Sequence, residues 1–475
     1  MKRNGKRILP LLLCVLLGAL LLSGCDALTR ELSGVMSAEE VAALDRYKNL
    51  KTLDLRGSTC YDAIEAYIAA HPQVAVSYTV DVAGTPCDPG IDSITIAPQD
   101  AEALAAVSRH LPKLRSIDLE GGGVTAETLR VLWDAIPEAR LRYSVDLLGQ
   151  SLPGDTKTLD LSGLSHAQAA EAAEALRLLP ALETVQLLDG AGESALPVED
   201  FIALKSAAPQ AAFSYRCELY GQEVSTETES LSYVNTEIGN EGAALFMRLL
   251  PCLDRLQRLS LDTCGIDDEV MAQMRDAFPD KEIVWRVVVG WKSFMSDVET
   301  VWAIGGLSDE QLEPLKYCTK VKYLDLGHNG ITKLDFVLYM PDLEVAIFEN
   351  DDLEDITLLG TCKNLEYLEI GETNVGDISP LANCTNLQHL CIGGLYKVTD
   401  ITPLYGLTKL VRLNMICDTN IPQYQIDEIQ ALLPGCYVEA FYSPMGPMNG
   451  GSWRYFGGAI APRYALLHDQ IGYDW

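Results

Sequence analysis

The stretch that decides the fold lies near the C-terminus. There, residues 365–386 read LEYLEIGETNVGDISPLANCTN and residues 387–409 read LQHLCIGGLYKVTDITPLYGLTK. Both segments begin with a leucine, continue with alternating apolar and polar residues, and later contain the sequence Asp-Ile-Ser/Thr-Pro-Leu. Alternation of period two over five residues predicts one short strand, and the later apolar positions fill the turn that returns the chain. We therefore expect a repeat protein.

The same frame extends outward from this stretch. Apolar residues open it at spacings of 22, 22, 22 and 23 residues, at Val321, Leu343, Leu365, Leu387 and Leu410. Polar side chains that can bond to backbone groups in a bend follow the first three strands, at Asn329, Asp351 and Thr373. The fourth frame departs from the pattern, because Gly393–Tyr396 contains one extra residue. One turn cannot bury its own apolar face, so neighbouring turns must stack into a solenoid.

The N-terminal half carries a longer variant of the repeat. Its strand-like triplets are separated by alternating spacings of 41, 23, 42, 26, 46, 28 and 42 residues, and they begin at Leu53, Ile94, Ile117, Leu159, Val185, Leu231, Leu259 and Val301. Each long interval contains a segment that starts at a proline and ends six residues later in an aromatic residue, at Tyr78, Tyr143, Tyr215 or Trp285. We expect an extra strand there, paired with the strand that follows it. Helical patterns closed by a proline cover Ala126–Ile136, His166–Leu179 and Gly242–Leu250.

These frames resemble the leucine-rich repeat (LRR). Within it, Asp377–Leu381 and Asp400–Leu404 resemble the bacterial internalin-like subclass. The resemblance implies an α/β solenoid, a horseshoe with a parallel concave sheet, helices on the convex side of the N-terminal half and short turns on that side of the C-terminal half. The predicted domains are a lipoprotein signal peptide (1–24), a lipidated tether and N-terminal cap (25–45), long alternating repeats with extra strands (46–300), regular repeats of 22–23 residues (301–433) and an aromatic, glycine-rich C-terminal cap over the last turn (434–475).

The N-terminus predicts export. Basic residues precede an apolar run from Ile8 to Leu22, which is shorter than the roughly 20 residues of a membrane-spanning helix. The following Leu22–Cys25 resembles the lipobox of bacterial lipoproteins, which implies cleavage before Cys25 and lipidation of its thiol. An ordinary signal peptide cut elsewhere is the alternative. The predicted location is the outer face of the bacterial cytoplasmic membrane, with Cys25 as the anchor at the cell surface.

Composition excludes several classes of function. The chain of 475 residues has 67 acidic and 36 basic residues, a formal charge of −31, so it repels phosphate backbones and we expect no nucleic-acid partner. No H-E-x-x-H, G-x-S-x-G or Walker A motif occurs, so we expect no cofactor and no catalysis. The acidic segment Glu349–Asp355 lacks the glycine and the spacing of an EF-hand loop and is interpreted as a solvated edge, with no metal.

The cysteines do not form a disulfide framework. There are 13, and no C-x-x-C pair for zinc or redox chemistry is present. Cys318, Cys362 and Cys384 occupy equivalent positions in their turns. A ladder of buried thiols is expected there, and a Cys362–Cys384 disulfide is the alternative.

The predicted site is the concave face, where the variable positions of each x-L-x-L-x strand point away from the core. The ligand-binding candidates are Trp302, Tyr323, Ile347, Tyr367 and His389, which form a mixed aromatic patch, together with the acidic residues Asp118, Asp160 and Asp325. Exposed aromatic side chains beside charges are typical of binding hot spots. The alternative is that exposed strands favour such residues without any partner.

The resemblance to internalin-like proteins implies recognition through the concave face. We therefore predict a lipid-anchored, non-catalytic binding module at the cell surface, whose partner is an extracellular protein or a glycan. Two alternatives stay open. One is an envelope scaffold acting within the cell's own surface, and the other is an enzyme with its site in the C-terminal tail or in the long intervals.

Overall fold

The computed structural model describes residues 29–416, 420–440, 454–456, 459–460 and 462–471. The predicted signal peptide and Cys25 lie outside the described residues. The chain forms two compact units, with the boundary between Cys217 and Glu218.

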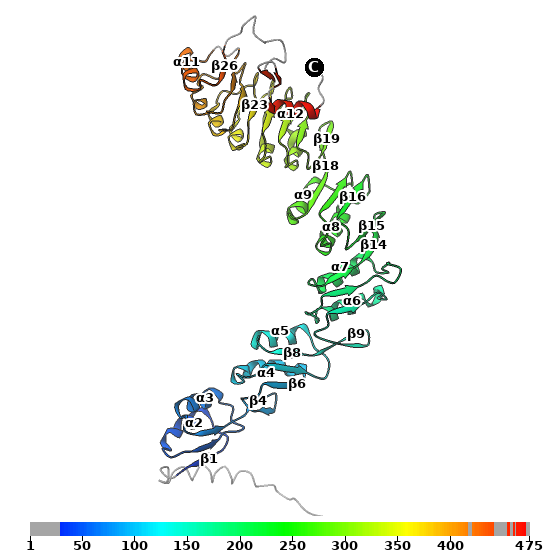
Figure 1. Cartoon of the computed structure of the whole chain (residues 1–475), viewed down its shortest axis with the longest axis vertical. Helices are drawn as coiled ribbons and strands as arrows, with labels where there is room; N and C mark the ends of the chain where they lie inside the picture. Colours follow the sequence, from blue (N-terminus) through cyan, green and yellow to red (C-terminus); the bar gives the residue numbers. More distant parts are fainter. Residues whose placement is uncertain (1–28, 417–419, 441–453, 457–458, 461, 472–475) are drawn as a thin grey trace, which may run out of the picture. The chain divides into compact units, whose positions relative to one another are not determined.

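Modules of one design follow each other in the first unit (Figure 1). A module has three parallel strands, helices between them and a following antiparallel hairpin. The strands and hairpin of the first module are β1 (Glu31–Ser33), β2 (Thr52–Asp54), β3 (Ala75–Ser77), β4 (Val80–Val82) and β5 (Thr85–Cys87). Its helices are α2 (Ala38–Ala42), the 3-10 helix η1 (Ala43–Arg46) and α3 (Tyr61–Ala70).

The next two modules repeat this order. The second contains β6 (Ser93–Ile96), η2 (Pro98–Asp100), α4 (Ala101–Val107), η3 (Ser108–His110), β7 (Ser116–Leu119), α5 (Ala126–Ala135), β8 (Arg140–Arg142), β9 (Ser144–Leu147) and β10 (Gln150–Pro153). The third contains β11 (Thr158–Asp160), α6 (His166–Leu176), β12 (Thr184–Gln186), α7 (Val198–Ala207), β13 (Ala212–Ser214), β14 (Arg216–Leu219) and β15 (Gln222–Ser225).

Local sequence explains these elements. Leu53, Ile117 and Val185, at the central positions of their strands, are buried, as the alternation predicts. Helix α5 begins after Thr125, whose hydroxyl accepts a hydrogen bond from the Thr128 N–H at 3.1 Å. Each predicted helix is present, in slightly shorter or shifted bounds.

The extra strand pairs with the strand that follows it, as expected, because β4 forms an antiparallel hairpin with β5. The first part of the extra strand also lies parallel to the strand that precedes it, as β3 does beside β2, which we did not expect. Two residues with positive φ form each of the first turns, Ala83-Gly84 and Leu148-Gly149, which is the geometry of a type I′ hairpin. Because of these hairpins, the described strands form a series of separate parallel sheets.

The boundary falls within β14, so the second unit begins with the end of that strand and β15. A module of the same design and the regular repeats follow. The module contains β16 (Ser230–Val234), α8 (Gly239–Leu249), η4 (Leu250–Cys252), β17 (Arg258–Asp262), α9 (Asp268–Ala277), β18 (Glu282–Val289) and β19 (Lys292–Met295). A seven-stranded parallel sheet follows, made of β20 (Thr300–Trp302), β21 (Tyr323–Asp325), β22 (Val345–Ile347), β23 (Tyr367–Glu369), β24 (His389–Cys391), β25 (Arg412–Asn414) and β26 (Tyr437–Glu439).

Short 3-10 turns return the chain between most strands of this sheet, as predicted. They are η5 (Glu313–Tyr317), which follows the short helix α10 (Asp309–Leu312), η6 (Asp335–Tyr339), η7 (Thr357–Thr361), η8 (Ser379–Asn383) and η9 (Thr402–Leu404). The last return differs from the expectation, because it contains a helix of three turns, α11 (Gln423–Leu432). The described tail contains β27 (Tyr455–Phe456), β28 (Ala459–Ile460) and α12 (Pro462–Ile471).

The register of the seven-stranded sheet follows the sequence period. Leu324 pairs with Ala346, Ala346 with Leu368, and Leu368 with Leu390, and all four side chains are fully buried. Asn329 shows why a polar residue follows the strand: its Oδ1 accepts from the Leu307 N–H at 2.8 Å and its Nδ2 donates to the Ala303 carbonyl at 2.8 Å. These bonds tie one repeat to the preceding one. Among the described residues, we find no helix with the length and apolar character needed to span a bilayer.

Candidate functional site

The predicted aromatic patch lies on the face of the seven-stranded sheet opposite the 3-10 turns, which we call the inner face. The structure brings Tyr323, Ile347 and Tyr367 together there with Val345. Our expectation that these side chains are exposed is wrong, because Ile347 and Tyr367 have no accessible surface and Tyr323 retains 8%. Asp325 and His389 are buried as well, and Trp302 is half-buried.

The patch is buried because the chain's own tail covers it. Helix α12 packs against β20, β21 and β22 (Figure 1). Its side chains Tyr464 and Leu467 enter the same apolar cluster as Tyr323, Ile347 and Tyr367. The rings of Tyr464 and Tyr367 stack with centroids 5.9 Å apart. The described helix of the tail therefore lies over the first strands of the sheet, and not over the last turn, where we expected a cap.

Arg454 supplies the polar half of this contact. Its Nε and one terminal nitrogen donate to the two carboxylate oxygens of Glu369, each at 3.1 Å, and the same terminal nitrogen lies 3.5 Å from Glu349. The guanidinium also lies over the Tyr464 ring, 5.0 Å from its centroid. A fork-shaped pair of this kind fixes geometry as well as charge. One cation thus joins the tail to the sheet.

Carboxyl groups outnumber cations around this contact. We name Asp325, Glu349 and Glu369 the acidic cluster, and Arg454 is the cation paired with it. Burial raises the pKa of Asp325 to about 6, and burial together with repulsion from Glu369 raises that of Glu349 to about 7. Arg454 opposes both shifts. Among the described residues, three carboxyl groups thus lie close to one guanidinium, and burial makes two of them harder to ionise.

The ends of the patch have their own partners. The Lys292 ammonium lies over the Trp302 ring, 3.1 Å from its centroid, and donates to the Trp302 carbonyl at 2.6 Å. The ring of His389 lies beside that of Tyr367, with centroids 5.8 Å apart, and burial next to Arg412 lowers its pKa to about 4. His389 is therefore neutral at physiological pH.

The two acidic candidates of the first unit lie on different sheets of that unit. Asp118, on β7, faces Arg142 on the neighbouring strand, with 3.6 Å between the charged atoms. Asp160, on β11, accepts a hydrogen bond from the Ser162 N–H at 3.0 Å, which lowers its pKa. Asp160 and its neighbours line a shallow hollow of about 350 Å³ over β11, β12 and β13. The hollow is formed by the same outward-facing strand positions that form the covered patch on the seven-stranded sheet, but here these positions are exposed.

The repeats also have counterparts among known proteins. Residues 363–406 match the family described as leucine-rich repeats, in two copies. This part of the chain consists of leucine-rich repeats. No curated protein matches the chain's sequence.

Solved structures of bacterial LRR proteins are similar to it at low identity. Internalin C2 of Listeria monocytogenes is 21% identical over 54% of this chain and 81% of its own, with a TM-score of 0.26. An LRR protein of Leptospira interrogans is 15% identical over 87% of this chain and 96% of its own, with a TM-score of 0.29. The functional domain of InlJ from Listeria monocytogenes, which includes a cysteine ladder, is 12% identical over 86% of this chain and 65% of its own, with a TM-score of 0.27.

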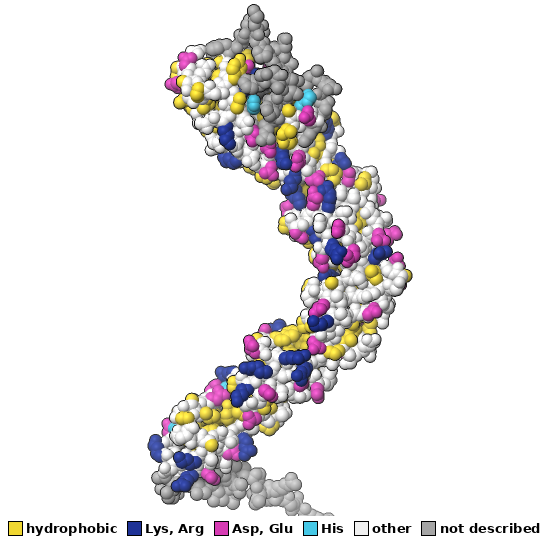
Figure 2. Space-filling view, in the orientation of Figure 1, with side chains coloured by type: hydrophobic (Ala, Val, Ile, Leu, Met, Phe, Trp, Pro, Cys, Tyr) yellow, Lys and Arg dark blue, Asp and Glu magenta, His cyan; other side chains and the backbone are white. Residues whose placement is uncertain are grey.

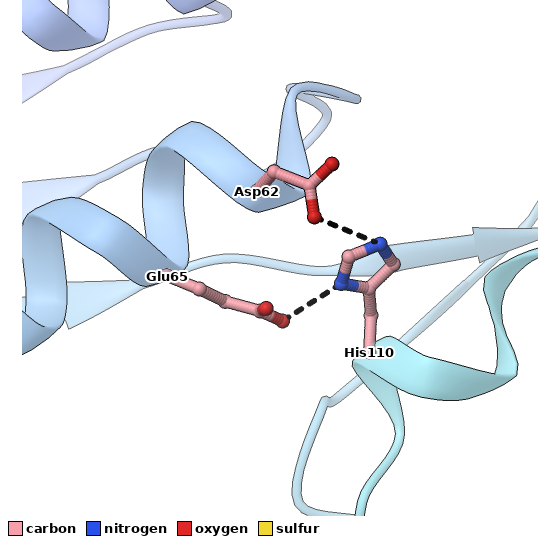
Figure 3. Close-up of side chains that lie close together, drawn as sticks. All are labelled: Asp62, Glu65 and His110. Atoms are coloured by element: carbon pink, nitrogen blue, oxygen red, sulfur yellow. Dashed lines mark hydrogen bonds and ion pairs between the residues drawn. The ribbon is translucent and has the colours of Figure 1, made fainter.

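Among the described residues of this chain, one group of side chains has the composition of a metal site. Asp62 and Glu65, on α3, flank the buried ring of His110, on η3 (Figure 3). Glu65 lies 2.9 Å from Nδ1, whereas Asp62 lies 4.0 Å from Nε2, which also accepts from Arg109 at 3.1 Å. One imidazole binds a metal through one nitrogen, so this arrangement does not gather both carboxylates on a single ion. We interpret it as a hydrogen-bonded link between two modules of the first unit.

The cysteine ladder has the form expected from the sequence. Cys318, Cys362 and Cys384 are buried free thiols, and the Cys384 Sγ lies 3.2 Å from the Leu359 carbonyl oxygen. Burial raises the pKa of Cys318 and Cys384 to about 12. In the segment Glu349–Asp355, Asp351 is buried, but Glu354 and Asp355 are exposed side chains engaged with Lys397 and Thr357. The segment is thus only in part a solvated edge.

Sequence reasoning missed five residues of the inner-face contact: Glu349, Glu369, Arg454, Tyr464 and Leu467. Glu349 stands in a column otherwise occupied by Gly327, Gly371 and Gly393, and this irregularity was a usable signal. Tyr464 and Leu467 are three residues apart and share a helix face. On the face seen in Figure 2, acidic and basic side chains are interspersed along the described chain, so charge alone does not mark the site.

Proposed function

We propose that this protein is a lipid-anchored module of the bacterial cell surface that binds a protein through its inner, concave faces and has no catalytic role. One observation carries the proposal: the inner face of the seven-stranded sheet already holds a polypeptide, the helix α12. It does so with stacked rings and a forked ion pair, which are the contacts that dominate protein interfaces. Anchoring rests on the lipobox-like Leu22–Cys25.

The first unit supports the same function with a free surface. Over β11, β12 and β13, the hollow presents the exposed side chains of Thr158, Asp160, Thr184 and Gln186. Small polar side chains on a rigid sheet adapt to a partner with little loss of conformational entropy. Asp118 and Asp160 would steer a cationic partner by charge more than they would hold it.

Site-specific crosslinking tests this function. A photoreactive residue is placed at Thr184, on the inner face, in the full-length chain in detergent. The matched control places it at Glu171, which is equally exposed on α6. Each protein is mixed separately with extracellular matrix proteins, with the cell's own envelope proteins and with wall polymers.

We expect a discrete protein adduct from position 184 and none from position 171. An adduct from the matrix proteins would indicate an external partner, and an adduct from the envelope proteins would indicate a scaffold within the cell's own surface. Equal adducts from both positions, or protection of position 184 by wall polymers alone, would contradict protein recognition through the inner face.

A further inference from the structure

Helix α12 occupies its place with a small set of contacts. In the described tail, Tyr464 and Leu467 are the two side chains that join the apolar cluster of the inner face, and Arg454 makes the forked pair with Glu369. The neighbouring Leu466 remains 38% exposed. Among the described residues of the tail, these three side chains supply the apolar and the charged part of the contact.

The surface beneath the helix is more apolar than the repeat requires. In an x-L-x-L-x strand the leucine positions face the core, and the x positions are free to be polar. The x positions of β22 are nevertheless Val345 and Ile347, and both are fully buried against the tail. With Tyr323 and Tyr367 they form the sheet's side of an apolar cluster that Tyr464 and Leu467 of α12 complete, and an apolar surface of this kind is typical of an interaction site.

The charges favour a basic occupant. The acidic cluster holds three carboxyl groups, and among the described side chains of the tail Arg454 is the cation placed against it. Arg454 reaches Glu369 and Glu349 but forms no ion pair with Asp325 among the described contacts. A protein segment that brings a guanidinium beside an aromatic ring can therefore make the same contacts with this face as the tail does. A segment with a second cation could in addition pair with Asp325.

We propose that α12 is an intramolecular occupant of the partner-binding site on β20–β23, and that the partner is a protein segment presenting an arginine beside an aromatic ring on an amphipathic helix, which displaces the tail. This inference rests on the proposed function, since it assigns that function's partner chemistry and its regulation. The tail holds the site closed because it is tethered: at an effective concentration of roughly 1 mM, a contact with a dissociation constant of about 0.1 mM is occupied about 90% of the time.

A peptide of residues 454–471 (RYFGGAIAPRYALLHDQI) tests the proposal without knowledge of the natural partner. The fluorescently labelled peptide is titrated into the full-length chain in detergent and followed by anisotropy. Three chains are compared: the wild type, the Tyr464→Ala/Leu467→Ala double variant, and Leu466→Ala as the matched control on the same helix. Near-ultraviolet circular dichroism verifies that each chain keeps its fold.

We expect the double variant to bind the peptide about 10-fold more tightly than the wild type and the Leu466→Ala chain, because its own tail no longer competes. A peptide with alanine at positions 464 and 467 should not bind. Arg454→Glu in the full-length chain, which leaves the sheet unchanged, should open the site in the same way and serves as the second route to the open state.

Equal affinity of the wild type and both opened variants would overturn the competition. No binding to folded, opened variants would overturn the assignment of the site. These outcomes are independent of the crosslinking experiment, since failure to find a natural partner leaves peptide binding unaffected. Peptide binding by itself, conversely, does not establish the surface function.

Discussion

Asp351 occupies the position that Asn329 holds one repeat earlier. Its Oδ1 accepts a hydrogen bond from the Asn329 N–H at 2.7 Å, whereas its buried Oδ2 has no hydrogen-bond partner among the described residues. Burial raises the pKa of Asp351 to about 8, so the carboxyl group is protonated at neutral pH. At this residue the repeat departs from its own pattern.

Asp351→Asn should stabilise the second unit. An amide can donate from the position of Oδ2, as the Asn329 Nδ2 donates to the carbonyl groups of Ala303 and Leu326. We expect the free energy of unfolding to increase by about 1–2 kcal/mol, the amount associated with satisfying a buried polar group. Urea unfolding at pH 7 measures it. Asn329→Asp, the reverse change one repeat earlier, is the control and should destabilise; a loss of stability in both variants would refute the equivalence of the two positions.

Glu349 should make stability depend on pH. Its pKa is about 7 in the folded chain against about 4.3 for an unperturbed glutamate, so the folded state holds the proton more tightly. Stability from this group is therefore complete below about pH 4 and is lost as pH rises through 7. His389, with its lowered pKa of about 4, acts in the opposite sense, since its contribution is lost as pH falls from about 6.5 towards 4.

The two effects separate above about pH 6.5, because most of the change that His389 contributes lies between its folded pKa of about 4 and its ordinary value of about 6.5. Between pH 6.5 and 8 we expect the urea midpoint of the wild type to fall, and Glu349→Gln should reduce that fall. Asp351→Asn should reduce it further, because the pKa of Asp351 lies still higher. An unchanged slope in Glu349→Gln would show that the carboxyl group of Glu349 is not the titrating group.

At the scale of elements, the strands of the seven-stranded sheet depend on their neighbours. Leu368, on β23, is fully buried between β22 and β24. Leu368→Ala should lower the free energy of unfolding by about 2–5 kcal/mol through lost burial and the cavity that remains. Calorimetry or urea unfolding gives the magnitude.

Hydrogen exchange on the same variant tests stacking. Because each repeat is stabilised by its neighbours, protection should decrease in β22 and β24 as well as in β23. Loss of protection confined to β23 would show that the repeats are stable individually. Ala346 and Leu390, which pair with Leu368, are the positions to compare.

At the scale of the whole molecule, attachment to the membrane depends on one thiol. If Cys25 carries the lipid, Cys25→Ala should prevent both the modification and the cleavage that depends on it, and the chain should accumulate as an unprocessed or soluble precursor. Membrane fractionation and the mass of the N-terminal peptide report this. Cys60→Ala, at the nearest described cysteine, is the control, and a processed, membrane-bound Cys25→Ala protein would rule out lipid anchoring at this position.

The sequence by itself determined the repeat, the positions of the strands and the buried leucines. It also determined the helices between the long repeats and the polar residue after each strand. These features are local or recur at a fixed interval: period-two alternation specifies which side chains face the core, and each repeat packs on the next by the same positions. Leu324, Leu368 and Leu390 therefore lie where the period places them.

Only the tertiary structure decided which surfaces are free. The sequence correctly placed Tyr323, Ile347 and Tyr367 on the face away from the leucine core, yet the tail buries them. The contact that does so joins Glu369 to Arg454 across 85 residues and follows no period. The pairing of each extra strand with its predecessor is decided in the same way, because a strand's partner depends on where the chain returns in space and not on its own alternation.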